Sequence, residues 1–155
     1  MKPFETSLPM VLYHTLDAVM PPFRAIFARF GITEQQWRVL RALWEQDGKP
    51  LLALAEKTLI QPPSLVGVVD RLQRDGLVER RRSRQDRRVV RVCLTGAGKA
   101  LRGRVTPLVD AAYSDLESTV SESEWAVLLA TLRKVAANAG SANGGFGAEA
   151  GLNMD

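Results

Sequence analysis

The chain has 155 residues and a mass of 17.1 kDa, which is one domain's length and is enough to bury a substantial core. One cysteine excludes an internal disulfide framework, and no phosphate-binding glycine loop or metal-spaced ligand set supports an enzyme. No apolar run has the length of a membrane span, and we do not expect the first residues to act as a signal peptide. We therefore expect a cytoplasmic protein with no membrane contact, catalytic residues, metal or cofactor.

Positive charge is concentrated in one part of the sequence. The whole chain carries +4, whereas the stretch from Arg71 to Arg104 holds twelve Lys or Arg and three acids, which is a net charge of +9. The remainder therefore carries −5. Like charges repel one another and do not help the chain to fold, so this band indicates an oriented contact with double-stranded DNA. A solvated basic surface is the alternative.

The first helices are predicted from apolar spacing and from their caps. Residues 8–30 are rich in apolar and aromatic side chains, and Pro21 and Pro22 should break or kink that helix. Thr33 with Gln36 forms a capping box for the next helix, which should end before Pro50. Its apolar spacing predicts the burial of Trp37, Leu40, Leu43 and Trp44.

A helix-turn-helix follows. Residues 51–58 predict a short helix, and residues 59–61 predict a turn. A second helix should open at Pro62 and end near Asp75, before Gly76. Its inward stripe is expected to be Leu65, Val68, Val69 and Leu72.

A basic hairpin comes next, over residues 77–95. Two runs of apolar and basic residues flank a polar tip at 83–87, and alternation at Val90, Val92 and Leu94 predicts one buried face. Helix, turn, helix and basic hairpin together are typical of a winged helix-turn-helix. Its second helix lies in the major groove, and its hairpin can reach an adjacent minor groove.

The C-terminal part is predicted to be helical. Thr95 should cap a helix that reaches about Ser118 with a kink at Pro107, and Ser121 with Glu124 should start another. A small winged helix cannot cover so many amphipathic helices, so we expect a homodimer. The predicted fold is mainly α with a small hairpin wing, in one domain over 1–138. The DNA-binding lobe spans about 33–95, the dimerisation helices about 8–30 and 95–138, and a disordered tail 139–155.

Three segments carry a family resemblance. Residues 86–95 resemble the D-x-R-x-x-x-V-x-L-T wing signature of the MarR family of bacterial transcription regulators. Residues 74–78 resemble the end of that family's recognition helix, and residues 33–40 the start of its second helix. Together with residues 63–65, the last motif is similar to the subgroup of homoprotocatechuate-operon repressors. The resemblance covers roughly Leu8 to Ala137.

The resemblance implies DNA-binding roles. In the wing, Asp86 would brace the turn and Arg88 would enter or order the minor-groove contact, while further contacts to groove or phosphates are expected from Arg81, Arg82, Arg84 and Arg87. In the recognition helix, the candidates are Gln61, Pro63, Ser64, Arg71 and Arg74. Since Pro62, Val66 and Gly67 cannot hydrogen-bond base edges with a side chain, specificity should rest partly on thymine methyl contacts and DNA shape.

The resemblance also implies a small phenolic or aromatic acid effector, bound between the dimer helices and the DNA-binding lobe. His14, Trp37 and Arg38 are candidates for that pocket, because an arginine suits a carboxylate. Alternatively, Trp37 is a core residue and the other two lie on the surface. We expect a ligand-released repressor that binds a pseudo-palindromic operator. The alternative function is a sequence-indifferent architectural DNA-binding protein without a ligand.

Overall fold

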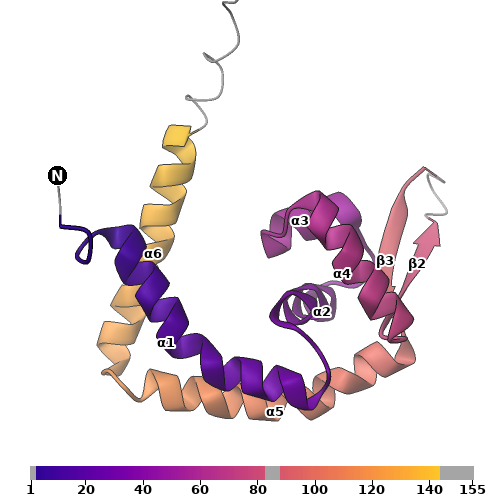
Figure 1. Cartoon of the computed structure of the whole chain (residues 1–155), viewed down its shortest axis with the longest axis horizontal. Coiled ribbons are helices and arrows are strands. Elements are labelled where there is room, and N and C mark those ends of the chain that lie inside the picture. The colour runs from indigo at the N-terminus through magenta and orange to yellow at the C-terminus, as the bar shows by residue number, and fades with distance from the viewer. Residues whose placement is uncertain (1–2, 83–87, 144–155) are drawn as a thin grey trace, which may run out of the picture. The chain divides into compact units, whose positions relative to one another are not determined.

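The structure, a computed structural model, describes residues 3–82 and 88–143. Figure 1 shows the helices and the small sheet of this part of the chain. The helices are α1 (Leu8–Arg29), α2 (Glu34–Glu45), α3 (Leu51–Thr58), α4 (Pro62–Arg74), α5 (Gly96–Glu117) and α6 (Glu122–Asn143). The strands are β1 (Lys49–Pro50), β2 (Val78–Arg82) and β3 (Val90–Leu94). The chain divides into two compact units, Met1–Ala112 and Tyr113–Asp155, and α5 crosses the boundary.

The first helix passes through its two prolines without a break. Of the two predicted effects, a break or a kink, the break does not occur, because Pro21 and Pro22 lie inside α1, whereas the ribbon of α1 changes direction along its length in Figure 1. A proline removes one helical hydrogen bond and bends a helix, and burial of the C-terminal half can offset that loss. Here Phe23 and Phe27 are buried in the second half of α1.

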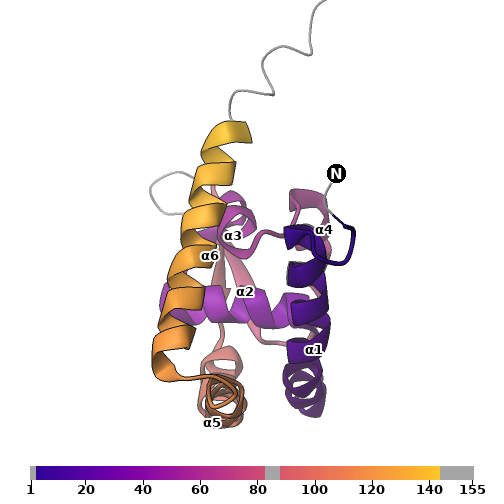
Figure 2. The same ribbon diagram turned by 90° about the vertical axis from the view of Figure 1, so that its left-hand side faces the viewer.

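The core of the first unit lies among α2, α3 and α4, and Figure 2 shows α2 running crosswise to α1. The predicted capping box opens α2, with Thr33 accepting from the Gln36 amide and the Gln36 side chain accepting from the Thr33 amide. The predicted stripe of α4 is buried, as is Leu40 on α2. Trp37 and Trp44 were expected to be buried but are only half-buried, because both border a surface cleft.

The sheet has three antiparallel strands in the order β1-β3-β2. The hairpin of β2 and β3 was predicted, and its register pairs Val78 with Leu94 and Arg82 with Val90. The strand β1 was not predicted, since two residues are too short to show alternation. Through it, the loop after α2 is joined to β3 at the base of the wing.

The helix α5 starts where the sequence indicated. Thr95 caps it by accepting a hydrogen bond from the Gly98 amide at 3.0 Å, and Pro107 lies inside the helix without ending it. At Gly98 the backbone comes close to the start of the wing, because a Cβ atom there would lie 2.1 Å from the Leu77 carbonyl oxygen. Only glycine fits this approach without a shift of the backbone.

The helix α6 belongs to the second unit and begins at the predicted capping box. The Ser121 hydroxyl and amide both donate to the Glu124 carboxylate, at 2.7 Å and 2.9 Å, and these bonds, that of the hydroxyl first, lower the pKa of Glu124. Residues 139–143, predicted as the start of a disordered tail, continue the helix, because the alanines around Gly140 favour helix enough to offset one glycine. The rest of the predicted tail, residues 144–155, lies outside the described residues.

Candidate nucleic-acid interface

The recognition helix α4 exposes one face. Its apolar stripe is buried, and all five residues predicted for DNA contact at this helix are exposed: Gln61, Pro63, Ser64, Arg71 and Arg74. Val66 is 44% exposed on the same face, where an apolar side chain could meet a thymine methyl. An exposed polar and basic helix face of this kind suits the major groove.

Two side chains of α2 hold the helix-turn-helix in place. Arg38 donates a hydrogen bond to the Thr58 carbonyl oxygen at the end of α3, at 2.6 Å. The buried Gln36 donates from its amide nitrogen to the Asp75 carboxylate at the end of α4, at 3.2 Å. Arg38 was predicted to line a ligand pocket, and that role stays a prediction; in this structure its guanidinium contacts the end of α3.

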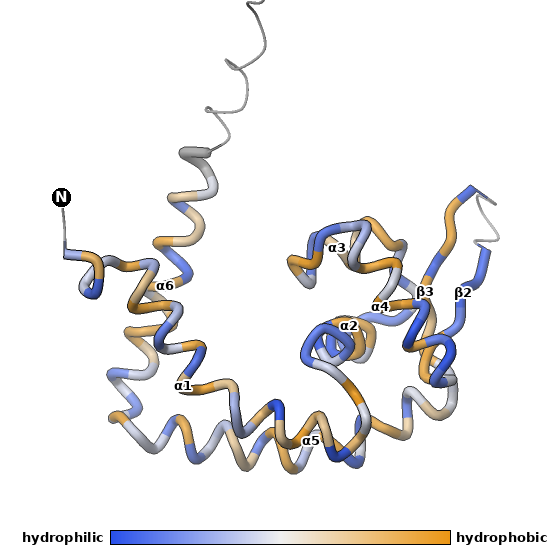
Figure 3. Tube along the Cα trace, in the orientation of Figure 1, coloured by the Kyte–Doolittle hydropathy of each residue, from blue (hydrophilic) through white to orange (hydrophobic). Residues whose placement is uncertain are grey.

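The wing hairpin has two faces with different neighbours. Because side chains alternate along a strand, Arg80 lies on the same face as the buried Val78, and Arg81 lies on the opposite face with Glu79. Figure 3 shows that β2 is predominantly hydrophilic, whereas hydrophobic residues recur along β3. The wing arginines therefore differ in their surroundings although they are adjacent in sequence.

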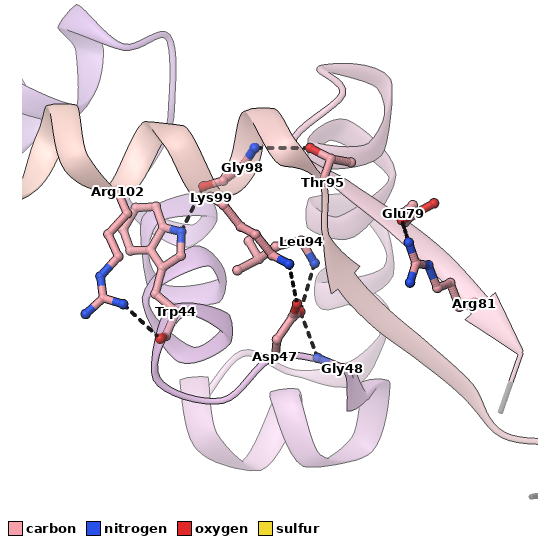
Figure 4. Close-up of polar contacts among 10 residues, drawn as sticks. All are labelled: Trp44, Asp47, Gly48, Glu79, Arg81, Leu94, Thr95, Gly98, Lys99 and Arg102. Atoms are coloured by element: carbon pink, nitrogen blue, oxygen red, sulfur yellow. Dashed lines mark hydrogen bonds and ion pairs between the residues drawn. The ribbon is translucent and has the colours of Figure 1, made fainter. Parts of the chain in front are cut away.

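The described wing arginines have distinct roles in the free protein. Arg81 forms an ion pair with Glu79, and this hydrogen bond raises the pKa of Arg81 above its usual value (Figure 4). Arg82 and Arg88 are exposed, as an electrostatic contact with phosphates requires. The other predicted wing residues, Arg84, Asp86 and Arg87, lie outside the described residues.

Asp47 anchors the base of the wing. Its carboxylate accepts hydrogen bonds from the amides of Gly48 and Leu94, both at 2.8 Å, as Figure 4 shows. Arg91 of β3 donates to the Gly48 carbonyl oxygen at 2.9 Å. The loop after α2 thus fixes the end of β3, next to the start of α5.

A cleft of about 170 Å³ lies between α2 and α5 in the first unit. Its lining residues are Trp37, Arg41, Trp44, Glu45, Arg102, Thr106, Val109 and Asp110. The Trp37 ring stacks on Phe27 at 4.7 Å between centroids and meets Trp44 edge-on at 5.4 Å. Two indole rings and two guanidinium groups thus share one small cleft.

Of the three residues predicted for a ligand pocket, only Trp37 lines this cleft. His14 is exposed near the start of α1, thirteen residues before Phe27, which is roughly 20 Å along a helix. Sequence reasoning missed Arg41, which lies one helical turn after Trp37, and this i, i+4 spacing could have identified it.

Two charged residues of the cleft, Arg41 and Glu45, form an ion pair, which Lys57 joins. The carboxylate of Glu45 lies 3.2 Å from Lys57 and 3.7 Å from Arg41. Lys57, through a hydrogen bond and its charge, lowers the pKa of Glu45. An incoming carboxylate would therefore compete with Glu45 for Arg41. Among residues 3–82 and 88–143, no group of three or more potential metal ligands occurs, and no helix is apolar and long enough to cross a membrane.

Comparison with known sequences gives the family. The sequence profile of the MarR family matches residues 32–90. The homoprotocatechuate degradative operon repressor of Escherichia coli is 38% identical over 112 residues, which cover 72% of this chain and 76% of the repressor. The transcriptional regulator FarR of Neisseria gonorrhoeae is 34% identical over 132 residues, which cover 83% of this chain and 90% of FarR.

Solved structures of similar fold agree with that family. NadR in complex with 4-hydroxyphenylacetate has 31% sequence identity and a TM-score of 0.76, over 87% of this chain and 98% of NadR. The repressor CouR bound to a 23-mer DNA duplex has 29% sequence identity and a TM-score of 0.78, over 88% of this chain and 98% of CouR. The family, the two sequence relatives and CouR are regulators of transcription rather than enzymes. The resemblance drawn from the sequence is thereby confirmed, and the chain belongs to the MarR family of transcription regulators.

Proposed function

We propose that the protein is a sequence-specific repressor that binds a pseudo-palindromic operator as a homodimer and is released by a small aromatic acid. The observation that carries the DNA-binding part is the exposed face of α4 beside a hairpin crowded with arginine. In this proposal α4 enters the major groove, and the wing, with Arg82, Arg88 and the tip arginines, contacts phosphates and the minor groove. The DNA complex of CouR supports it.

The homodimer rests on apolar surface that each unit leaves exposed. On α1, Leu8, Val11 and Leu16 are each about half exposed, and α6 exposes Val127 by 64%. Several exposed apolar side chains on one helix indicate a protein interface. The helices predicted for dimerisation, over about 8–30 and 95–138, would bury it against a second copy. Two copies would present two α4 helices to successive major grooves.

The cleft between α2 and α5 is the proposed effector site. At about 170 Å³ it is smaller than the roughly 300–1,000 Å³ of drug-sized pockets, so it suits a single aromatic ring. The ring would pack against Trp37 and Trp44, and a carboxylate would pair with Arg41 or Arg102. The bound 4-hydroxyphenylacetate of the similar protein NadR supports this ligand class.

Selection of binding sites from a random DNA library tests the proposal. We expect enrichment of an inverted repeat with half-sites about 10 bp apart, bound at least about 10³-fold more tightly than random DNA at physiological salt. Sedimentation should show a dimer, free and on DNA. The alternative, an architectural DNA-binding protein, requires equal affinity for selected and random duplexes, and that result would refute sequence-specific repression.

The ligand part is tested separately, with 4-hydroxyphenylacetate as the probe. The probe should weaken binding to the selected site and quench the fluorescence of the cleft tryptophans. Benzyl alcohol, which has a ring but no carboxylate, is the control and should do neither at the same concentration. Equal effects of the two compounds would refute the proposed role of the arginines.

A further inference from the structure

Arg80 has different neighbours from the other described arginines of β2. Its guanidinium lies 2.7 Å from the Asp70 carboxylate and donates a hydrogen bond to the Gln73 side-chain oxygen at 2.8 Å. Both partners belong to α4, so these contacts join the wing directly to the recognition helix. The Arg80 side chain is 26% exposed, against 65% for Arg81.

The strand geometry explains why Arg80 reaches α4. The turn after α4 is fixed at its base, where the Leu77 amide donates to the Leu72 carbonyl oxygen at 2.9 Å and Val78 is buried. Arg80 lies two residues beyond Val78 on the same face, roughly 7 Å further toward the wing tip. Its bonds to α4 therefore add a second fixed point, and two fixed points set the angle of the hairpin to the helix.

We propose that Arg80 is a positioning residue: it clamps the wing to the recognition helix and neutralises Asp70, and it is not itself a phosphate contact. This inference rests on the proposed function. Asp70 is exposed on the DNA-facing side of α4, where an unpaired carboxylate would repel phosphates. The helix and the wing are proposed to read different grooves, so a change in their angle prevents both from fitting one operator. The clamp therefore determines sequence preference.

The decisive variant removes both members of the ion pair. Arg80→Ala combined with Asp70→Asn leaves the net charge unchanged, so a purely electrostatic role predicts wild-type behaviour. The positioning role predicts that affinity for the selected operator falls by about tenfold or more, the loss expected for a good specific contact. The affinity for random DNA should stay within about twofold of the wild-type value, which is the usual deviation when the effects of two substitutions are added. The salt dependence should stay unchanged.

Arg82→Ala is the matched control, because Arg82 lies on the same strand and is exposed. Its loss should weaken operator and random DNA alike and lower the slope of log affinity against log salt by about 0.9. Asp70→Asn alone should raise the affinity for random DNA and lower the ratio of operator affinity to random-DNA affinity. Arg80→Lys keeps a charge beside Asp70 and should retain more preference than Arg80→Ala.

The outcomes separate this inference from the proposed function. If the charge-neutral double variant keeps the wild-type operator preference, the positioning role is overturned and the proposed function is not. The same holds if Arg80→Ala weakens operator and random DNA alike, as Arg82→Ala does. A wild-type protein without operator preference overturns the proposed function as well. Thermal unfolding of each variant checks that the variant is folded. If Arg80→Ala does not fold, Asp70→Asn and Arg80→Lys test the same preference.

Discussion

The indole N–H of Trp44 donates a hydrogen bond to the carbonyl oxygen of Gly98 at 2.9 Å, which joins the end of α2 to the first turn of α5 (Figure 4). Arg102, one turn further along α5, returns a contact of 3.4 Å to the Trp44 carbonyl oxygen. The close approach of Gly98 to Leu77 brings the start of the wing to the same place. Gly98 is therefore a point where three segments pack without room for a side chain.

Gly98→Ala should destabilise the protein. The added Cβ would meet backbone atoms of Leu77, so α5 or the wing must shift, at a cost of about 1–3 kcal/mol as for other overpacked sites. Gly103→Ala in the same helix is the control, since nothing lies within 4 Å of its added Cβ, and it should stabilise by about 0.4–1 kcal/mol. Urea unfolding at one fixed protein concentration measures both. Equal effects at the two glycines would contradict the close packing.

Arg41→Ala and Arg38→Ala should differ in effect. Arg41 lines the cleft, so its loss should weaken the response to 4-hydroxyphenylacetate about tenfold or more while operator binding remains, because a charge-assisted bond contributes about 1.5–3 kcal/mol. Arg38 bonds to the end of α3, so its loss should lower stability. Titration of the effector against a preformed DNA complex, together with thermal unfolding, distinguishes them. An Arg38→Ala protein of normal stability that has lost its effector response would support the sequence-based expectation instead.

Leu59→Gly should raise stability. Leu59 has a φ of +54° and is 85% exposed, so the residue strains the backbone and buries little apolar surface. The left-handed conformation costs a non-glycine residue roughly 1–2 kcal/mol, which exceeds the roughly 0.5–1 kcal/mol of extra chain entropy that glycine adds on unfolding. The midpoint of urea unfolding should therefore increase slightly. A clear decrease would mean that the side chain has a stabilising contact.

Cys93 should react slowly with thiol reagents at neutral pH. Burial, followed by the charge of Asp47, raises the pKa of the Cys93 thiol, and the thiolate is the reactive form. Because the folded-state pKa is raised, the corresponding stability is present below the ordinary thiol pKa and is lost as pH rises through the folded value. The modification rate of native protein, compared with the same chain in denaturant across pH, checks this. Equal rates in both states would contradict it.

The boundaries of the helix-turn-helix could be predicted because the sequence marks them. Pro50 precedes α3, Pro62 opens α4, and Gly76 with a φ of +70° follows the end of α4. These residues act through local backbone geometry, which does not depend on the rest of the fold. The same locality explains why the capping boxes of α2 and α6 were found.

Features that depend on contacts between distant segments could not be predicted. The role of Arg80 follows from its contact with Asp70, which requires the angle between strand and helix. A composition argument treats all wing arginines alike, and so it could not separate Arg80 from Arg82. Similarly, the continuity of α1 through Pro21 depends on the burial of Phe23 and Phe27, which a local rule for proline does not include.

The sheet order has a consequence for how the protein avoids aggregation. With β3 in the centre, β1 and β2 are the two edges, where another chain could add a strand. The β1 edge is two residues long and contains Pro50, which has no amide hydrogen to offer. The β2 edge carries Arg81 and Arg82, whose charge repels the same edge of a second molecule. Arginines placed to meet DNA thus also keep free molecules apart. If they were neutralised, the β2 edge could pair with a strand of another molecule.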